Sequence, residues 1–198
     1  MTKGTVGSVT RRLPRQYKVP LRSYATVVGE IVWASNYLYG AFEILFSHVA
    51  TPGNFLMGRG IWQSASSERA KLDMLEAAVE TSESLASPMQ DRIIWTIGCA
   101  RKLAELRNDA VHSATIVVSK NGSPMLVPSD IGTKQKRSDR LRAEPDLKKK
   151  YRVVKGDLLQ LGQYVFAIWP HVAGFEHLPR LPARPRFQSI PKAKPRKP

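Results

Sequence analysis

Arg107, Asn108 and His112 are the residues of this chain whose types and spacing could do chemistry. They stand where the apolar pattern of a predicted helix ends. Asn108 and His112 are four residues apart and share a helix face, so the Asn side chain could fix the orientation of the imidazole. An arginine supplies a fixed charge in a planar fork suited to phosphate, and a histidine titrates near neutral pH. Together they could bind a phosphodiester and move a proton without a metal ion.

The same residues also fit an ordinary helix C-terminus, where Arg and His favour the negative end of the helix dipole. Arg107 and His112 are roughly 140° apart around the helix axis. They therefore reach one pocket only if the arginine bends around the helix or if a second copy lies alongside. Arg107 falls on the apolar stripe of its helix, between Ala104 and Val111. A charged side chain buried there would need a partner, a ligand or a cleft.

The stretch Arg107-Asn108-Asp109-Ala110-Val111-His112 resembles the signature of the HEPN superfamily (higher eukaryote and prokaryote nucleotide-binding domains). That signature is an Arg, usually followed by a polar residue, and then a His after four to six intervening residues. The resemblance extends over about residues 22–175. It implies an all-α bundle that is usually dimeric, with two motifs facing each other across a cleft. Many members of this superfamily are metal-independent RNases, some of them toxins or defence components, and others only bind RNA or partner proteins.

Three amphipathic helices should position the motif. The first is expected over residues 22–49, and its apolar positions repeat in a heptad-like pattern that suggests a central bundle element or a dimer seam. The second should begin at Ser66 or Ser67 and run to about Ser84, with its acidic residues facing water. The third should begin at Ser87-Pro88 and contain the motif. The first helix has one stripe of Val28, Ile31, Ser35, Leu38, Phe42, Leu45 and Val49, and a second of Trp33, Tyr37, Gly40 and Ile44. The expected water-facing acids are Glu68, Asp73, Glu76 and Glu80, and the expected stripe of the third helix is Ile93, Ile97, Ala100, Ala104 and Val111.

The remaining segments complete an all-α prediction, a HEPN-like bundle of four to five helices with a small β-hairpin insertion. Residues 55–63 read as a connection folded onto the core through Phe55, Leu56, Ile61 and Trp62. Residues 115–128 read as a hairpin about Asn121-Gly122. Residues 129–152 should be a basic loop or an exposed helix. Asp157 is the expected cap of a final helix over residues 158–172. The domain is thus residues 22–177, between disordered basic arms at 1–21 and 178–198.

The charge lies mainly outside the predicted core. The 198 residues include 31 Lys and Arg against 16 Asp and Glu, a net charge of +15. Residues 1–22 and 178–198 contain no acidic residue. A polyanion is the expected partner, RNA first and DNA second, although solubilising charge is the alternative. The predicted nucleic-acid-binding residues are Lys134, Lys136, Arg137, Arg140, Arg142, Lys148, Lys149, Lys150, Lys192, Lys194, Arg196 and Lys197.

The sequence predicts no cofactor and no metal site, because no His or second carboxylate cluster joins the acidic residues of the second helix. A single cysteine, Cys99, excludes an internal disulfide and is expected to be buried. No apolar run is long enough for a membrane span, and residues 1–22 lack the apolar region of a secretory signal. We therefore expect a cytoplasmic protein.

The sequence is compatible with three functions. The first is a metal-independent endoribonuclease in which Arg107 binds the scissile phosphate, His112 is the general acid or base, and Asn108 orients His112 or contacts the phosphate. Asp109 either raises the pKa of His112 or is a solvated carboxylate. The second is a non-catalytic nucleic-acid-binding or assembly protein in which the basic arms provide the affinity. The third is an interaction bundle with a partner protein or antitoxin. A homodimer packed through the motif-bearing helix and its neighbour is expected.

Overall fold

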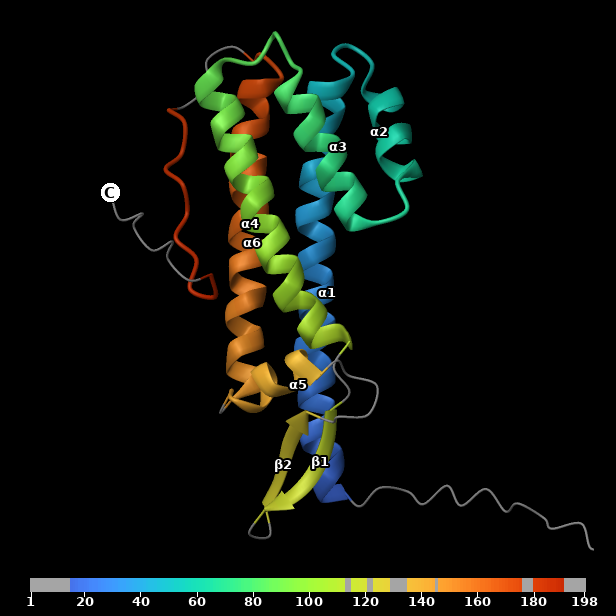
Figure 1. Ribbon diagram of the computed structural model, residues 1–198, viewed down its shortest axis with the longest axis vertical. Helices are drawn as coiled ribbons and strands as arrows, with labels where there is room; N and C mark the ends of the chain where they lie inside the picture. The colour runs from blue at the N-terminus through green and yellow to red at the C-terminus, as the bar shows by residue number, and fades with distance from the viewer. Residues whose placement is uncertain are drawn as a thin grey trace, which may run out of the picture.

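Three long helices run side by side along the length of the protein in the computed structural model (Figure 1). They are α1 (Arg15–Ala50), α4 (Ser87–His112) and α6 (Leu147–Val172). The shorter α2 (Phe55–Ser64) and α3 (Glu68–Glu80) lie at one end, and α5 (Gln135–Arg142) lies at the other. The structure describes residues 15–112, 115–120, 123–128, 135–144, 146–175 and 180–190. The prediction of an all-α bundle is confirmed at this level.

One small sheet accompanies the bundle. The strands β1 (Thr115–Lys120) and β2 (Ser123–Pro128) pair in antiparallel fashion, with Thr115 opposite Pro128 and Lys120 opposite Ser123. The sheet lies beyond the end of α4 and beside the first turns of α1 (Figure 1). The predicted turn residues Asn121 and Gly122 lie outside the described residues.

The core is formed where α1 meets the other helices. The first stripe predicted for α1 is buried from Ile31 to Val49, because its heptad-like spacing keeps one face toward α6 and α4. The second stripe is buried only in part, since Trp33 is 62% exposed, whereas Tyr37 is half-buried and packs on Phe166 of α6. Val111 of α4 is also exposed, whereas the prediction placed it in the core.

Helix α1 begins at Arg15, earlier than predicted, and passes through Pro20. A proline in the second turn of a helix forfeits only one backbone hydrogen bond, and the long packed helix that follows offsets this cost. Predicting a start at Arg22 was therefore wrong. Residues 15–21 belong to α1 rather than to a disordered arm.

The predicted connection at 55–63 is a helix, α2. The Asn54 side chain caps it by accepting a hydrogen bond from the Met57 N–H at 3.1 Å. Gly58 lets α2 approach α1 closely, because a Cβ there would lie 2.6 Å from the Ser47 Cα. Trp62 is buried as expected, but Phe55, Leu56 and Ile61 are exposed. Two glycines in ten residues weaken the helix signal, which explains why sequence reasoning missed this helix.

The basic segment before α6 is more ordered than predicted. Asp146 caps α6 by accepting a hydrogen bond from the Lys149 N–H at 3.0 Å, so α6 begins at Leu147 rather than at 158. Asp157 is not a cap, because it is a buried residue in the middle of α6. The segment 129–152 thus contains α5 and the first turns of α6. Both are anchored by buried apolar side chains: Leu141, Leu147 and Tyr151.

Residues 180–190 form a strap that runs along the bundle beside α4 and α6 (Figure 1). Phe187 stacks on Trp95 of α4 with ring centroids 5.9 Å apart. Asp157 accepts hydrogen bonds from the Gln188 N–H at 3.2 Å and from the Ser189 N–H at 2.7 Å and hydroxyl at 2.5 Å. The prediction of a disordered tail from 178 is therefore wrong for these residues. Prolines prevent a helix there but do not prevent packing.

Candidate functional site: the hollow between α3 and α4

Helix α3 runs antiparallel to α4, and its first turn lies beside Arg107. Ser67 starts α3 by accepting a hydrogen bond from the Ala70 N–H at 3.1 Å, which selects Ser67 over Ser66 as the cap. Between the two helices lies a hollow of about 1020 Å³, with Tyr39 of α1 at its wall. Its lining residues are Tyr39, Ser67, Glu68, Arg69, Leu72, Asp73, Arg101, Ala104, Glu105, Arg107 and Asn108.

Arg107 is held inside this hollow by two partners. Its Nη1 donates to the Asn108 Oδ1 at 2.8 Å, and its Nη2 pairs with the Glu68 carboxylate. Only 17% of its side chain is exposed, and its Nε is buried with no hydrogen-bond partner among the described residues. The expectation that a half-buried Arg107 would need a partner is confirmed. The expectation that Glu68 faces water is wrong, because Glu68 is that partner.

A second arginine ties α3 to α4 further along the hollow. Arg101 donates to Asp73 at 2.7 Å and pairs with Glu76. The hydrogen bond that Arg101 donates to Glu76 raises the pKa of Arg101 above its usual range, so the guanidinium stays charged. Asp73 and Glu76 are thus ion-pair partners rather than simply solvated carboxylates. The hollow is balanced in charge, since three arginines and three carboxylates line it: Arg69, Arg101, Arg107, Glu68, Asp73 and Glu105.

Tyr39 brings a polar group to the hollow that sequence reasoning did not single out. Its hydroxyl is buried and has no hydrogen-bond partner among the described residues. Burial raises the pKa of Tyr39 above its ordinary value, and the nearby Glu68 carboxylate raises it further. The phenol is therefore a neutral potential donor at neutral pH. Tyr39 belongs to neither of the two apolar stripes predicted for α1. This position outside both stripes is the sequence feature that could have marked Tyr39 as a candidate site residue.

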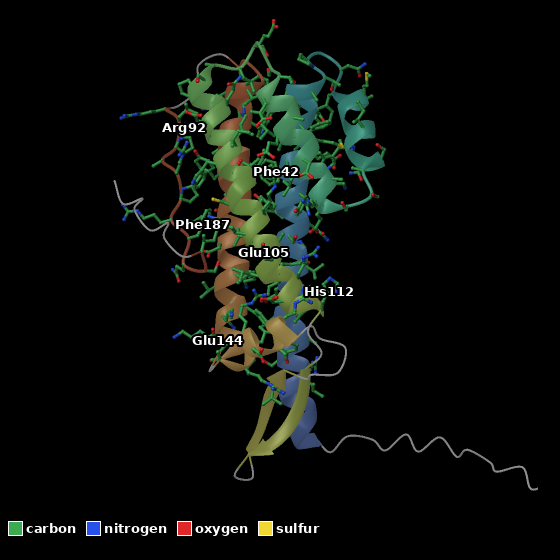
Figure 2. The ribbon with its side chains drawn as sticks, in the orientation of Figure 1. Phe42, Arg92, Glu105, His112, Glu144 and Phe187 are labelled. Carbon is green, nitrogen blue, oxygen red and sulfur yellow. The ribbon has the colours of Figure 1, made fainter. Side chains whose placement is uncertain are left out.

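His112 lies outside the hollow. It is the exposed last residue of α4, and Figure 2 shows it further along this helix than Glu105, toward the hairpin. It shares a helix face with Glu105 and Asn108, both of which line the hollow. One chain therefore brings Arg107 and Asn108 together in the hollow and leaves His112 about one turn beyond it. The Asn108 side-chain oxygen accepts a hydrogen bond from Arg107, and the orientation of His112 by Asn108 stays a prediction.

Asp109 is buried, and its partners come from α5. Its Oδ1 accepts from the Arg137 Nε at 3.1 Å and from the Arg140 Nη2 at 2.5 Å. The reading of Asp109 as a solvated carboxylate is wrong, because only 1% of its side chain is exposed. Arg137 and Arg140 are thus fixed against α4, whereas the prediction placed them in a flexible loop or a helix exposed all round.

The structure describes five of the other ten predicted nucleic-acid-binding residues. Arg142 and Lys149 are exposed, and Lys150 is half-buried, 3.7 Å from the Glu144 carboxylate. Lys136 belongs to α5, and Lys148 is half-buried in the first turn of α6. The remaining predicted residues lie outside the described part of the chain: Lys134, Lys192, Lys194, Arg196 and Lys197.

Cys99 is buried, as predicted, and burial raises the pKa of its thiol. Across the described ranges, no group of three or more His, Cys, Asp or Glu side chains is placed to hold a metal ion. In the same ranges, no helix has both the length and the apolar character needed to cross a membrane. Comparisons with protein-family models, with curated proteins and with solved structures find no match for this chain.

Proposed function

We propose that this protein is a metal-independent endoribonuclease of the HEPN type that acts as a homodimer. The observation that supports this most directly is the placement of Arg107. A half-buried guanidinium faces a hollow large enough for a nucleotide, and the next residue of the motif, Asn108, orients it. Burying an arginine is costly unless it is used or paired.

Each side chain of the motif has a distinct role in the proposed reaction. Arg107 binds the scissile phosphate and stabilises the charge that develops on its oxygens. Its bonds to Asn108 and Glu68 each use one N–H of an Nη group that carries two. His112 removes the proton from the 2′-hydroxyl or returns one to the leaving oxygen. Asn108 and Glu68 are positioning residues, because they contact Arg107.

A second copy of the chain completes the proposed site. Within one chain His112 lies beyond the hollow, and it is exposed. Two copies that pair through the ends of their α4 helices would bring two His112 side chains to one phosphodiester, one as base and one as acid. The exposed Val111 beside His112 supplies apolar surface for such a contact.

The second candidate is a non-catalytic nucleic-acid-binding or assembly protein. The observation that favours it is the ion pair between Arg107 and Glu68 within one chain, in a hollow whose charges balance. In this reading the motif stabilises the packing of α3 on α4. Affinity for nucleic acid then comes from the basic residues elsewhere in the chain.

Cleavage of a mixed RNA pool in the presence of a chelator separates the two candidates. We expect cleavage by the wild type, and a loss of about 10²–10⁴ in rate for His112→Ala. Arg107→Ala should lose activity to a similar degree, and Asn108→Ala less. The matched control is Lys102→Ala, which removes an exposed side chain of the same helix outside the hollow. A wild type that cuts no RNA would favour the second candidate.

Mixed dimers test the requirement for two histidines. Wild-type and His112→Ala chains, co-expressed in graded ratios, should give activity that falls with the square of the wild-type fraction. A site contained in one chain would give a linear fall. Sedimentation of the same samples checks that dimers form, and a monomer at micromolar concentration would contradict the composite site.

A further inference from the structure

The motif contains a second group, Asp109, that binds two arginines from another element. Its carboxylate is almost completely buried, and both Arg137 and Arg140 of α5 donate to the same oxygen, Oδ1. The other oxygen, Oδ2, is buried with no hydrogen-bond partner among the described residues. Because two guanidinium groups share one carboxylate, the cluster retains net positive charge.

Arg137 and Arg140 each contact the buried Asp109 through the guanidinium group and also expose part of the side chain to solvent. The Arg137 side chain is 26% exposed and that of Arg140 is 45% exposed, against 1% for Asp109. Their bonds to Asp109 use Nε of the first and Nη2 of the second. A guanidinium carries five N–H donors in a rigid fork that matches phosphate. Two such forks fixed by a common carboxylate lose little rotamer entropy when an anion binds.

A purely structural role explains this cluster less well. Helix α5 is already anchored by the buried side chains of Leu141 and Ser138. A buried carboxylate with one oxygen unsatisfied is destabilising compared with an apolar residue of similar size. Arg140 would also be a poor choice for an internal clamp, because nearly half of its side chain is exposed to water. Residues that destabilise the fold locally in this way tend to occur at functional sites.

We infer that Asp109 holds Arg137 and Arg140 as a preordered site for a phosphate of a nucleic-acid backbone. Asp109 is three residues before His112, roughly one helical turn away and about 60° around the axis. The site therefore lies next to the end of α4, where the proposed cleavage would occur. This inference rests on the proposed function in taking nucleic acid as the ligand. It does not require that the protein cleaves it.

The test measures binding of the full chain to a single-stranded DNA oligonucleotide by fluorescence anisotropy over a range of salt concentrations. DNA lacks the 2′-hydroxyl, so no cleavage by the proposed mechanism complicates the result. Arg137→Gln and Arg140→Gln should each weaken binding and reduce the slope of log affinity against log salt by about 1. Lys102→Gln, which removes the same charge from an exposed position on α4, is the control and should leave the slope nearly unchanged.

Asp109→Asn distinguishes positioning from net charge. This variant makes the protein more positive, so charge alone predicts tighter binding, whereas loss of the clamp predicts weaker binding. Circular dichroism checks its folding, and the exposed Arg140→Gln keeps the test decisive if Asp109→Asn unfolds. The inference is overturned if Arg140→Gln behaves like Lys102→Gln, or if folded Asp109→Asn binds more tightly. A wild type that binds through this site but cuts no RNA would refute the nuclease alone.

Discussion

At the scale of single residues, the hollow contains polar groups whose hydrogen bonding is incomplete. The Tyr39 hydroxyl and the Arg107 Nε are both buried without a hydrogen-bond partner among the described residues. An unsatisfied buried donor costs about 1–3 kcal/mol, so a fold selected only for stability would have little reason to keep two in one place. Their presence around Glu68 fits a hollow that accommodates a polar ligand.

Tyr39→Phe tests this view of the hollow. Removing a buried hydroxyl that has no partner should leave the free energy of unfolding unchanged or raise it by up to about 1 kcal/mol. Tyr164→Phe is the matched control, because the Tyr164 hydroxyl accepts a hydrogen bond from Arg92 at 2.7 Å, and its loss should cost about 1 kcal/mol. Urea unfolding measures both. A Tyr39→Phe variant as destabilised as Tyr164→Phe would mean that the Tyr39 hydroxyl is satisfied in solution.

At the scale of elements, α3 positions Arg107 only if its first turn is formed. The Ser67 hydroxyl caps that turn, and Glu68 directly follows it. Ser67→Ala should lower the free energy of unfolding by about 0.5–2 kcal/mol, whereas the exposed neighbouring variant Ser66→Ala should change it by less than about 0.5 kcal/mol. Thermal and urea unfolding report the difference. Equal effects would show that the cap does not control the first turn of α3.

The strap 180–190 is a second element whose order depends on one residue. Asp157→Asn weakens the charge-assisted hydrogen bonds that the Asp157 carboxylate accepts from the Gln188 and Ser189 N–H groups. Each such bond contributes about 1.5–3 kcal/mol to the free energy of unfolding. We expect faster amide exchange in residues 187–190 and little change in α1. Figure 2 shows Phe187 of the strap beside the bundle, so the Trp95 fluorescence should change as well. Unaltered exchange in the strap would mean that the stacking on Trp95 is sufficient to hold it.

At the scale of the whole molecule, a net charge of +15 is combined with a hollow whose own charges balance. In the proposed function, attraction of nucleic acid therefore comes mainly from charges elsewhere in the chain. We expect the logarithm of the affinity for nucleic acid to decrease linearly with the logarithm of the salt concentration. Because residues 180–190 pack on the bundle, a truncation that tests the basic tail should begin after Ile190.

Removal of residues 191–198 tests this attraction. It eliminates Lys192, Lys194, Arg196 and Lys197 and should flatten the salt slope, while the melting temperature stays unchanged. Replacing the same four residues by Gln in the full-length chain is the control for chain length. If both variants retain the wild-type slope, the tail does not contact the polyanion.

Local patterns in the sequence are sufficient to predict the helices whose buried side chains recur with regular helical periodicity. The heptad-like stripe of α1 from Ile31 onward is buried, α4 begins at Ser87, and a serine hydroxyl caps α3. The position of Arg107 on an apolar stripe also indicates that it needs a partner. These predictions succeed because burial of a helix face and capping depend on residues within a few positions of each other.

Only the tertiary structure decides which polar groups meet. Glu68 and Arg107 are 39 residues apart in the chain, and Asp109 lies 28 and 31 residues from its two arginines. Asp157, which resembles a helix cap in the sequence, binds a strap 31 and 32 residues further on. Helical periodicity predicts the helix face on which such a side chain lies, but it does not predict which residue of another element contacts that side chain. A buried carboxylate and a solvated one therefore look alike until the packing of the helices brings its cation into contact.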